Sequence, residues 1–191
     1  MILRLDHVSI AVKDYEGARR FFQDLLGAVP CTSAEDDRMK YIWKIFSLGD
    51  LTRLEILTPT GRGSFLDGFL ANKDGGVHHI TLQTADIIRA RRTLEEKGFP
   101  YFGYNEYVGG VWKELFIHPR DAFGVLIQIA EFRPDDWLCD AVRLPRDKRW
   151  TVAKSARNVS LTLSHPGGGK ARFDLTREET EALIKALQAS L

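Results

Sequence analysis

The chain has 191 residues, 28% of them charged, and its 27 basic and 26 acidic side chains leave a formal net charge of +1 at pH 7. This balance argues against a protein that binds nucleic acid or a membrane surface, because such proteins need a basic excess. The length permits one substantial core, or two small packed modules with an appendage. Two cysteines, no N-terminal secretion signal and no apolar run of about 20 residues lead us to expect a soluble cytoplasmic protein.

The first predicted elements are a strand and a helix. Residues 4–12 alternate as in a strand with one buried face, and His7 lies on the face opposite the main apolar residues. Asp14 is suited to the N-cap of a helix, which should end at Gly27. The apolar residues of this helix form one stripe that we expect to face the core: Ala18, Phe21, Phe22, Leu25 and Leu26.

Two further strands follow the helix. Residues 33–38 are polar and predict a loop, whereas Tyr41–Phe46 and Arg53–Leu57 have the composition of paired strands. In the second of these strands, Glu55 lies on the face opposite its apolar neighbours. Glu55 is therefore expected to point away from the main apolar layer, as His7 does.

The chain then repeats this pattern. Aligning His79 with His7 gives an offset of 72 positions (79 − 7), and Gln128 follows Glu55 by 73 (128 − 55). The second copy predicts a strand after Gly75, a helix over Ile87–Lys97, and a hairpin of residues 111–117 and 124–131. A repeat of this length, with both strand and helix character, indicates two fused, similar modules. Each module offers one His on its first strand and one Glu or Gln on its last.

The last part of the chain has no counterpart in the repeat. Residues 133–147 predict a surface arm, and Val159–Leu163 and Lys170–Leu175 predict a hairpin. Thr176 and Glu179 form a capping box that begins a final helix. The apolar side chains of this helix need a surface to pack on, in the same chain or in a second subunit, so we expect an ordered tail.

Four residues that can bind a metal lie at equivalent positions of the two modules: His7, Glu55, His79 and Gln128. If the modules pair about a pseudo-twofold axis, these side chains reach one cavity. Two imidazoles with oxygen donors suit Zn, Ni, Fe, Co or Mn. A single His in a strand is usually structural, and we assign that role to His78, which lies on the core side. Four candidates in register favour a metal site instead.

Five segments carry a resemblance to a known family: LDHVSIAVKD (Leu5–Asp14), TRLEILTP (Thr52–Pro59), GRGSFLDGFL (Gly61–Leu70), GGVHHI (Gly75–Ile80) and FIHPRDAFGVLIQI (Phe116–Ile129). Over residues 3–131 the chain resembles the vicinal oxygen chelate superfamily of glyoxalases, bleomycin resistance proteins and dioxygenases, and within it the methylmalonyl-CoA epimerases. The resemblance implies an α+β fold: two fused βαβββ modules form a cup-shaped mixed sheet around a metal site, and a C-terminal β-hairpin and helix follow. We expect one domain at residues 1–132, with modules at about 1–60 and 75–132, and the arm, hairpin and helix at 133–191.

The resemblance also implies a divalent-metal-dependent isomerase, an epimerase that removes the α-proton of an acyl-CoA thioester, and a homodimer. Its implied ligands for one ion of Co, Ni, Zn, Mn or Fe are His7, Glu55, His79 and Gln128. Glu55 and Gln128 are also the implied catalytic residues. The family has a glutamate at the position of Gln128, and an amide can bind an ion but cannot take a proton. A second acid/base group is not identified, although Glu106 and Glu114 lie near in the chain.

Three alternatives remain open at this point. A glyoxalase-type lyase would use the same ligands, including a Glu at position 55. A non-catalytic small-molecule binding or resistance protein could share the fold, because fold alone does not decide function. An Fe(II) dioxygenase needs two His and one carboxylate. In the ring-cleaving relatives that carboxylate lies on the last strand, so Gln128 argues against this alternative.

Overall fold

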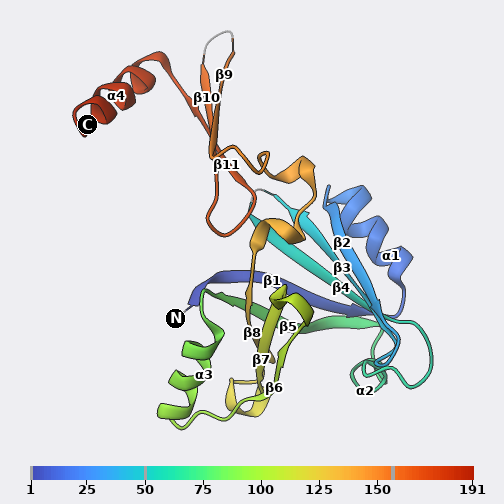
Figure 1. The fold of residues 1–191 in the computed structure, drawn as a ribbon. Coiled ribbons are helices and arrows are strands. Elements are labelled where there is room, and N and C mark those ends of the chain that lie inside the picture. Colours follow the sequence, from blue (N-terminus) through green and yellow to red (C-terminus); the bar gives the residue numbers. More distant parts are fainter. Residues whose placement is uncertain (1, 50, 156–157) are drawn as a thin grey trace.

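A large curved sheet forms the main body of the molecule (Figure 1). The computed structural model describes residues 2–49, 51–155 and 158–191. The strands of this eight-stranded sheet are, in chain order, β1 (Ile2–Val12), β2 (Val29–Asp36), β3 (Tyr41–Leu48), β4 (Thr52–Pro59), β5 (Gly75–Thr84), β6 (Phe102–Glu106), β7 (Trp112–Ile117) and β8 (Ile127–Phe132). Across the sheet their order is β2-β3-β4-β1-β5-β8-β7-β6.

This order places two βαβββ units side by side. In the first unit β1 pairs parallel with β4, and in the second β5 pairs parallel with β8. Each unit then continues through antiparallel strands to its own edge of the sheet. The units meet where β1 and β5 pair antiparallel. The predicted fold class, two fused βαβββ modules in one mixed sheet, is confirmed.

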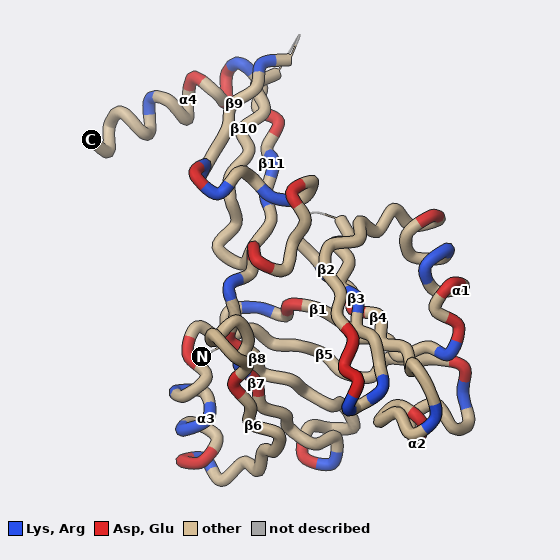
Figure 2. Tube along the Cα trace, turned by 45° about the vertical axis from the view of Figure 1, so that its right-hand side comes forward, with Lys and Arg blue, Asp and Glu red and all other residues tan. Residues whose placement is uncertain are grey.

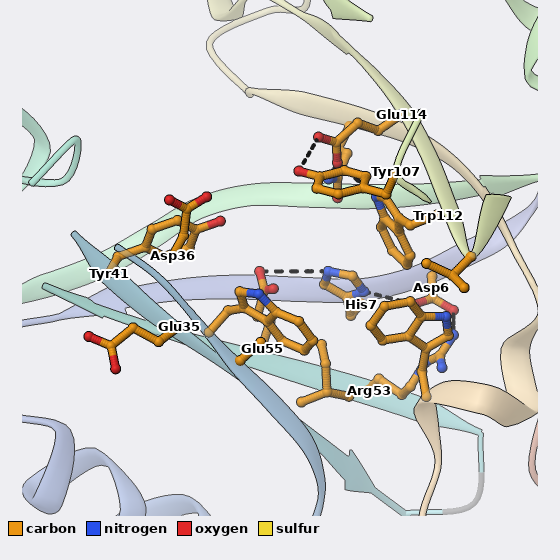
Figure 3. Close-up of a pocket in the computed structure, with 16 residues that line it drawn as sticks. Asp6, His7, Glu35, Asp36, Tyr41, Arg53, Glu55, Tyr107, Trp112 and Glu114 are labelled. Carbon is orange, nitrogen blue, oxygen red and sulfur yellow. Dashed lines mark hydrogen bonds and ion pairs between the residues drawn. The ribbon is translucent and has the colours of Figure 1, made fainter. Parts of the chain in front are cut away.

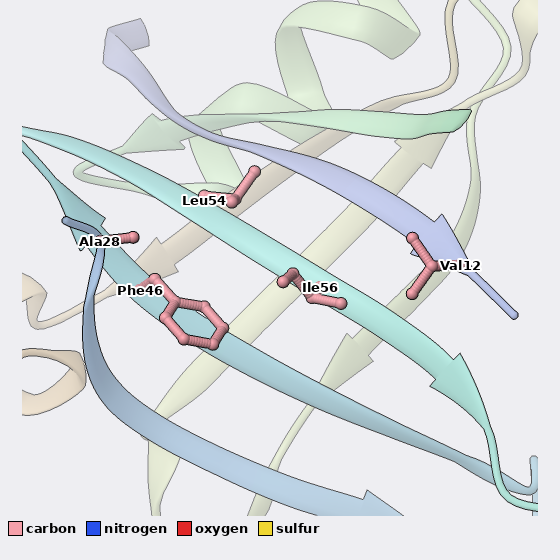
Figure 4. Packing of buried hydrophobic residues seen from close by; sticks show 5 residues of the cluster. All are labelled: Val12, Ala28, Phe46, Leu54 and Ile56. Atoms are coloured by element: carbon pink, nitrogen blue, oxygen red, sulfur yellow. The ribbon is translucent and has the colours of Figure 1, made fainter. Parts of the chain in front are cut away.

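Each unit packs a helix against its strands. The helices of the main body are α1 (Tyr15–Arg19), which continues as the π-helical segment η1 (Arg20–Leu25), α2 (Asp67–Leu70) and α3 (Ile87–Glu96). Below α1 the buried cluster consists of Val12, Ala28, Phe46, Leu54 and Ile56 (Figure 4). Below α3 it consists of Ile87, Ala90, Leu94, Leu115 and Ile129. Burying one such large aliphatic side chain contributes roughly 1.5–3 kcal/mol, so these clusters hold the helices on the sheet.

Two predictions about the first unit are wrong. Residues 33–38 were expected to form a loop, but most of them belong to β2, which pairs with β3 at the edge of the sheet. An edge strand can be polar because its outer side meets water. The apolar stripe of the first helix is only partly buried, since Leu25 remains 70% exposed. Within η1, Phe22 packs against the core, whereas Phe21 is 51% exposed.

The C-terminal part forms a second, three-stranded sheet and a helix. These elements are β9 (Trp150–Lys154), β10 (Val159–Ser164), β11 (Lys170–Leu175) and α4 (Arg177–Gln188). The predicted hairpin is β10 with β11, and the predicted capping box at the start of α4 is confirmed. Strand β9 was not anticipated. Figure 1 shows α4 extending away from the large sheet, and its apolar side chains are exposed.

Short helical turns connect several of these elements: η2 (Val108–Gly110), η3 (Pro119–Asp121), η4 (Pro134–Trp137) and η5 (Asp140–Val142). The turn η4 directly follows β8, and so it links the last strand of the large sheet to the C-terminal part. None of the described helices has the length and apolar character that a membrane crossing requires.

Candidate metal centre and its cavity

Strand register brings the four predicted ligands to one face of the large sheet. Ser9 of β1 pairs with His79 and Glu55, and Thr81 of β5 pairs with His7 and Gln128. Directly opposed residues on neighbouring strands point their side chains to the same face. The sheet therefore presents a serine between one His and the Glu, and a threonine between the other His and the Gln. This symmetric placement follows from the internal repeat.

His7 is oriented by a buried carboxylate. Its Nδ1 lies 2.7 Å from Oδ2 of Asp6, and both side chains are fully enclosed. Burial acts to raise the pKa of Asp6, but the hydrogen bond with His7 and the charge of Arg53 together lower it. Asp6 is therefore ionised, and we assign the proton of His7 to Nδ1. In this tautomer Nε2 carries no proton, as in histidines whose second nitrogen binds a metal.

His79 presents Nε2 to the same point. This atom lies 2.9 Å from the Ser9 hydroxyl and 3.6 Å from Oε2 of Glu55. Burial lowers the pKa of His79 well below its usual value, and the neighbouring histidines act in the same direction. The imidazole is therefore neutral near pH 7, which is the form that binds a metal.

His78 lies at an irregularity in the pairing of β5 with β1 and is not one of the three clustered potential ligands. Its ring packs edge-on against Phe65 and Phe69, with centroid distances of 5.6 and 4.9 Å. Its Nδ1 lies 2.9 Å from Nδ1 of His79. Burial, with the nearby charge of Lys73, lowers the pKa of His78 to about 4. His78 thus contacts the ring of His79.

Glu55 completes a cluster of three potential ligands. Its Oε2 accepts a hydrogen bond from Ser9 and lies 3.8 Å from Nε2 of His7. Burial raises the pKa of Glu55, and the neighbouring His7 and the hydrogen bond from Ser9 offset part of this increase. One ligand atom from each of His7, Glu55 and His79 lies within 4.8 Å of the other two. Two imidazole nitrogens and one carboxylate oxygen at this spacing fit a divalent cation after small side-chain adjustments.

Gln128 lies beside this cluster and is held on both sides. Its carbonyl oxygen accepts from the Thr81 hydroxyl, which also lies 2.9 Å from Nε2 of His7. Its amide nitrogen donates to Oε2 of Glu114 at 2.6 Å. These contacts orient the carbonyl oxygen of Gln128 toward the His7 side of the cluster. The amide can therefore offer an oxygen to a cation but no proton-accepting group.

A cavity of about 280 Å³ is lined by His7, Glu55 and Gln128 (Figure 3). Its aromatic walls are formed by Tyr41, Trp43, Tyr107, Trp112 and Trp137. The acidic end of β2, red in Figure 2, lies at this cavity, where Glu35 and Asp36 contribute to the lining. The site thus combines a metal-binding corner with apolar surface, the usual make-up of a small-molecule pocket.

Of the two further carboxylates considered from the sequence, only one lies at the site. Glu114 lines the cavity, and burial raises its pKa despite hydrogen bonds from Trp112 and Gln128. Glu106 is exposed and accepts a hydrogen bond from Tyr104 instead. Sequence reasoning missed Asp6 and Trp137 altogether. Trp137 lies outside the repeat, so the repeat gave no signal for it.

Two sequence comparisons identify relatives of the chain. Residues 6–116 match the family model of the Glyoxalase/Bleomycin resistance protein/Dioxygenase superfamily. The ethylmalonyl-CoA/methylmalonyl-CoA epimerase of Cereibacter sphaeroides is 39% identical over 134 residues, which cover 69% of this chain and 99% of that protein. The mitochondrial methylmalonyl-CoA epimerase of Homo sapiens is 35% identical over 130 residues, which cover 67% of this chain and 73% of that protein.

Solved structures agree in fold. Methylmalonyl-CoA epimerase from Mycobacterium tuberculosis superimposes with a TM-score of 0.62 at 26% identity, covering 70% of this chain and 90% of that one. A methylmalonyl-CoA epimerase determined with methylmalonyl-CoA and ammonium gives a TM-score of 0.60 at 24% identity, covering 69% of this chain and 96% of that one. At the latter identity the likeness concerns the fold alone.

Proposed function

The chain belongs to the glyoxalase/bleomycin resistance protein/dioxygenase superfamily, and on this premise we propose that it is an isomerase that epimerises an acyl-CoA thioester. The observation that carries the proposal is the meeting of His7, Glu55 and His79 beside a cavity. The similar proteins named as methylmalonyl-CoA epimerases support the substrate class. Methylmalonyl-CoA is the first substrate to test.

The proposed metal ligands are Nε2 of His7, Nε2 of His79 and a carboxylate oxygen of Glu55. The carbonyl oxygen of Gln128 is a weaker fourth ligand. A divalent cation held there would act as a Lewis acid on the thioester carbonyl and so make the neighbouring α-proton more acidic. Asp6 orients the ring of His7 for this role. The identity of the metal is left open by this donor set, which suits Co, Ni, Zn, Mn and Fe.

Within this proposal Glu55 takes the α-proton. It is the carboxylate of the cluster, and the Ser9 hydroxyl fixes one of its oxygens. Gln128 holds its position through Thr81 and Glu114 but cannot accept a proton. Glu114 is a buried carboxylate that lines the cavity, and it is the candidate for the opposite face of the α-carbon. A cytoplasmic location and a homodimer stay predictions from the sequence.

The proposal is tested by α-proton exchange in heavy water. Methylmalonyl-CoA should exchange its α-proton with the wild type, and Glu55→Gln should nearly abolish exchange, because loss of an acid/base group costs about 10²- to 10⁴-fold. Gln128→Glu should raise the rate by supplying a carboxylate on the last strand. The exposed Glu106→Gln is the matched control and should leave the rate unchanged. Unchanged exchange in Glu55→Gln would remove Glu55 from the mechanism.

Metal analysis separates the enzyme from a binding protein on the same fold. We expect one divalent ion per chain after purification, and its loss in the His7→Ala/His79→Ala double variant with the fold retained. Full occupancy of the double variant would show that the ion binds elsewhere. Exchange or turnover with a hemithioacetal, but with no acyl-CoA, would favour a glyoxalase-type lyase over the epimerase.

A further inference from the structure

Two arginines and one carboxylate meet at one end of the cavity. The guanidinium groups of Arg4 and Arg53 both bind the Asp6 carboxylate. Arg53 is only 4% exposed and lines the cavity. Within the described residues no other carboxylate forms an ion pair with either arginine. Two cations therefore share one anion, and an anionic ligand is favoured at this end of the cavity. The other carboxylates of the lining, Glu35, Asp36, Glu55 and Glu114, lie away from this pair of arginines.

The turn η4 brings a tryptophan to the same cavity. Nη1 of Arg53 donates to the carbonyl oxygen of Pro134, the first residue of the turn, at 3.2 Å. At the other end of the turn, the ring of Trp137 packs between Trp43 and Trp112, with centroid distances of 5.6 and 5.1 Å. Trp137 lies beyond residue 116, where the family match ends.

Two N–H donors of these cavity residues lack a partner. Nε1 of Trp137 and Nε of Arg53 are buried and make no hydrogen bond within the described part of the chain. A buried indole N–H usually finds an acceptor, and an unmade hydrogen bond in such a place is costly. One unpaired donor is neutral and the other belongs to a cation. Together they suit an oxygen anion better than an apolar group.

The C-terminal sheet holds the turn in place. The backbone N–H of Gly169 donates to Oδ1 of Asp135 at 3.1 Å. At Gly168, with φ +87°, an added Cβ would lie 2.5 Å from Cβ of Pro134, so only glycine permits this approach. The glycine loop between β10 and β11 therefore fits against η4. The C-terminal part thus serves as a support for Trp137.

We propose that Arg53 and Trp137 form a carboxylate subsite that binds the free carboxylate of a malonyl-type acyl group. The inference rests on the proposed function and names its substrate class. Arg53 and Glu55 are successive residues on the cavity face of β4, roughly 7 Å apart along the strand. A short acyl group can therefore reach both, with its carboxylate at Arg53 and its α-proton toward Glu55. The subsite orients the acyl group for proton removal.

The test compares two ligands that differ at the carboxylate. Isobutyryl-CoA has a methyl group where methylmalonyl-CoA has its carboxylate. Trp137→Phe keeps an aromatic wall but deletes the N–H donor. Isothermal titration calorimetry should show that this change weakens methylmalonyl-CoA binding roughly tenfold, as for a hydrogen bond to a charged group, and leaves isobutyryl-CoA within about twofold. The difference should appear with and without added Zn²⁺, because a bound metal can also attract the carboxylate.

Trp150→Phe is the matched control, since Trp150 is 61% exposed on β9. It should change neither affinity. Equal losses for both ligands in Trp137→Phe would reduce Trp137 to a packing role, and no loss for either would overturn the subsite. Should the Phe variant not fold, Trp137→Leu also deletes the donor and must show the same selective loss. α-Proton exchange by the wild type distinguishes the two proposals. If the wild type exchanges the α-proton but Trp137→Phe binds the two ligands with equal losses or none, only the subsite is overturned. If the wild type neither binds methylmalonyl-CoA nor exchanges its α-proton, both proposals are overturned.

Discussion

Asp6 is a site residue that the alternation of polar and apolar residues along β1 could not reveal. Leu5 pairs with Leu82 and His7 with Thr81, so β1 carries one extra residue at Asp6. This β-bulge breaks the period of two, and Asp6 and His7 are both buried although they are consecutive. The strict alternation used for prediction therefore found the ligand but not the carboxylate that orients it.

The first prediction follows from this contact. Asp6→Asn should weaken metal binding by about 10- to 100-fold, the usual effect of losing the carboxylate behind a ligating histidine. Competition with a zinc-binding dye measures the affinity, and circular dichroism checks the fold. Asp36→Asn is the control, because Asp36 lines the cavity but accepts from the Met39 amide instead. Equal affinity of Asp6→Asn and wild type would mean that His7 needs no orienting partner.

The candidate ligands themselves were predictable because the repeat places them in equivalent strands. His7, Glu55 and His79 meet as expected, within 4.8 Å. Gln128 lies next to them, joined through Thr81. The role of all four in binding a metal stays a prediction. The repeat could not indicate Arg53 or Trp137. The residue of the second module that aligns with Arg53 is Leu126, and Trp137 follows the repeat.

At the level of elements, prediction succeeded where one face of a strand is buried. Strands β1, β4 and β5 lie in the middle of the sheet, and the alternation of polar and apolar residues in their sequences predicted them. Strands β2 and β6 form its two edges and are largely exposed on both sides. Without a buried face there is no apolar period, and residues 33–36 of β2 were therefore expected to form a loop. Strand β9 is exposed along its length and was not predicted for the same reason.

The second prediction concerns the core below α1. Ile56 of β4 is fully buried there, so Ile56→Ala should lower the free energy of unfolding by about 2–5 kcal/mol. Val152→Ala on β9 removes an exposed side chain and should stay within about 0.5 kcal/mol of wild type. Urea denaturation followed by circular dichroism gives both values. A loss below about 1 kcal/mol at Ile56 would contradict the packing described.

At the scale of the molecule, the large sheet is complete at Phe132, before the C-terminal part begins. All four candidate ligands precede that residue. Nothing in the hydropathy of the last residues indicated that η4 would reach the cavity, because that contact depends on the shape of the glycine loop. We expected the tail, residues 133–191, to be ordered because its helix needs a surface to pack on. The apolar face of that helix remains exposed in the single chain.

The last prediction separates the two parts. A chain truncated after Phe132 should keep the metal affinity of the full chain, because the removed residues hold none of the candidate ligands. It should lose the preference for methylmalonyl-CoA over isobutyryl-CoA in the absence of metal, since Trp137 and its support are gone. Dye competition and calorimetry measure the two properties. A truncated chain that still discriminates between the ligands would place the carboxylate elsewhere.

The positions of the tryptophans should also make the intrinsic fluorescence of the protein sensitive to ligand binding. Of the four indoles in the chain, Trp43, Trp112 and Trp137 surround the cavity, and Trp150 is exposed. Intrinsic fluorescence excited near the indole band should therefore respond to ligand binding without any label. In Trp150→Phe the remaining emission would come from the cavity alone. Iodide, a quencher confined to water, should then reach the free protein poorly and the ligand-bound protein still less.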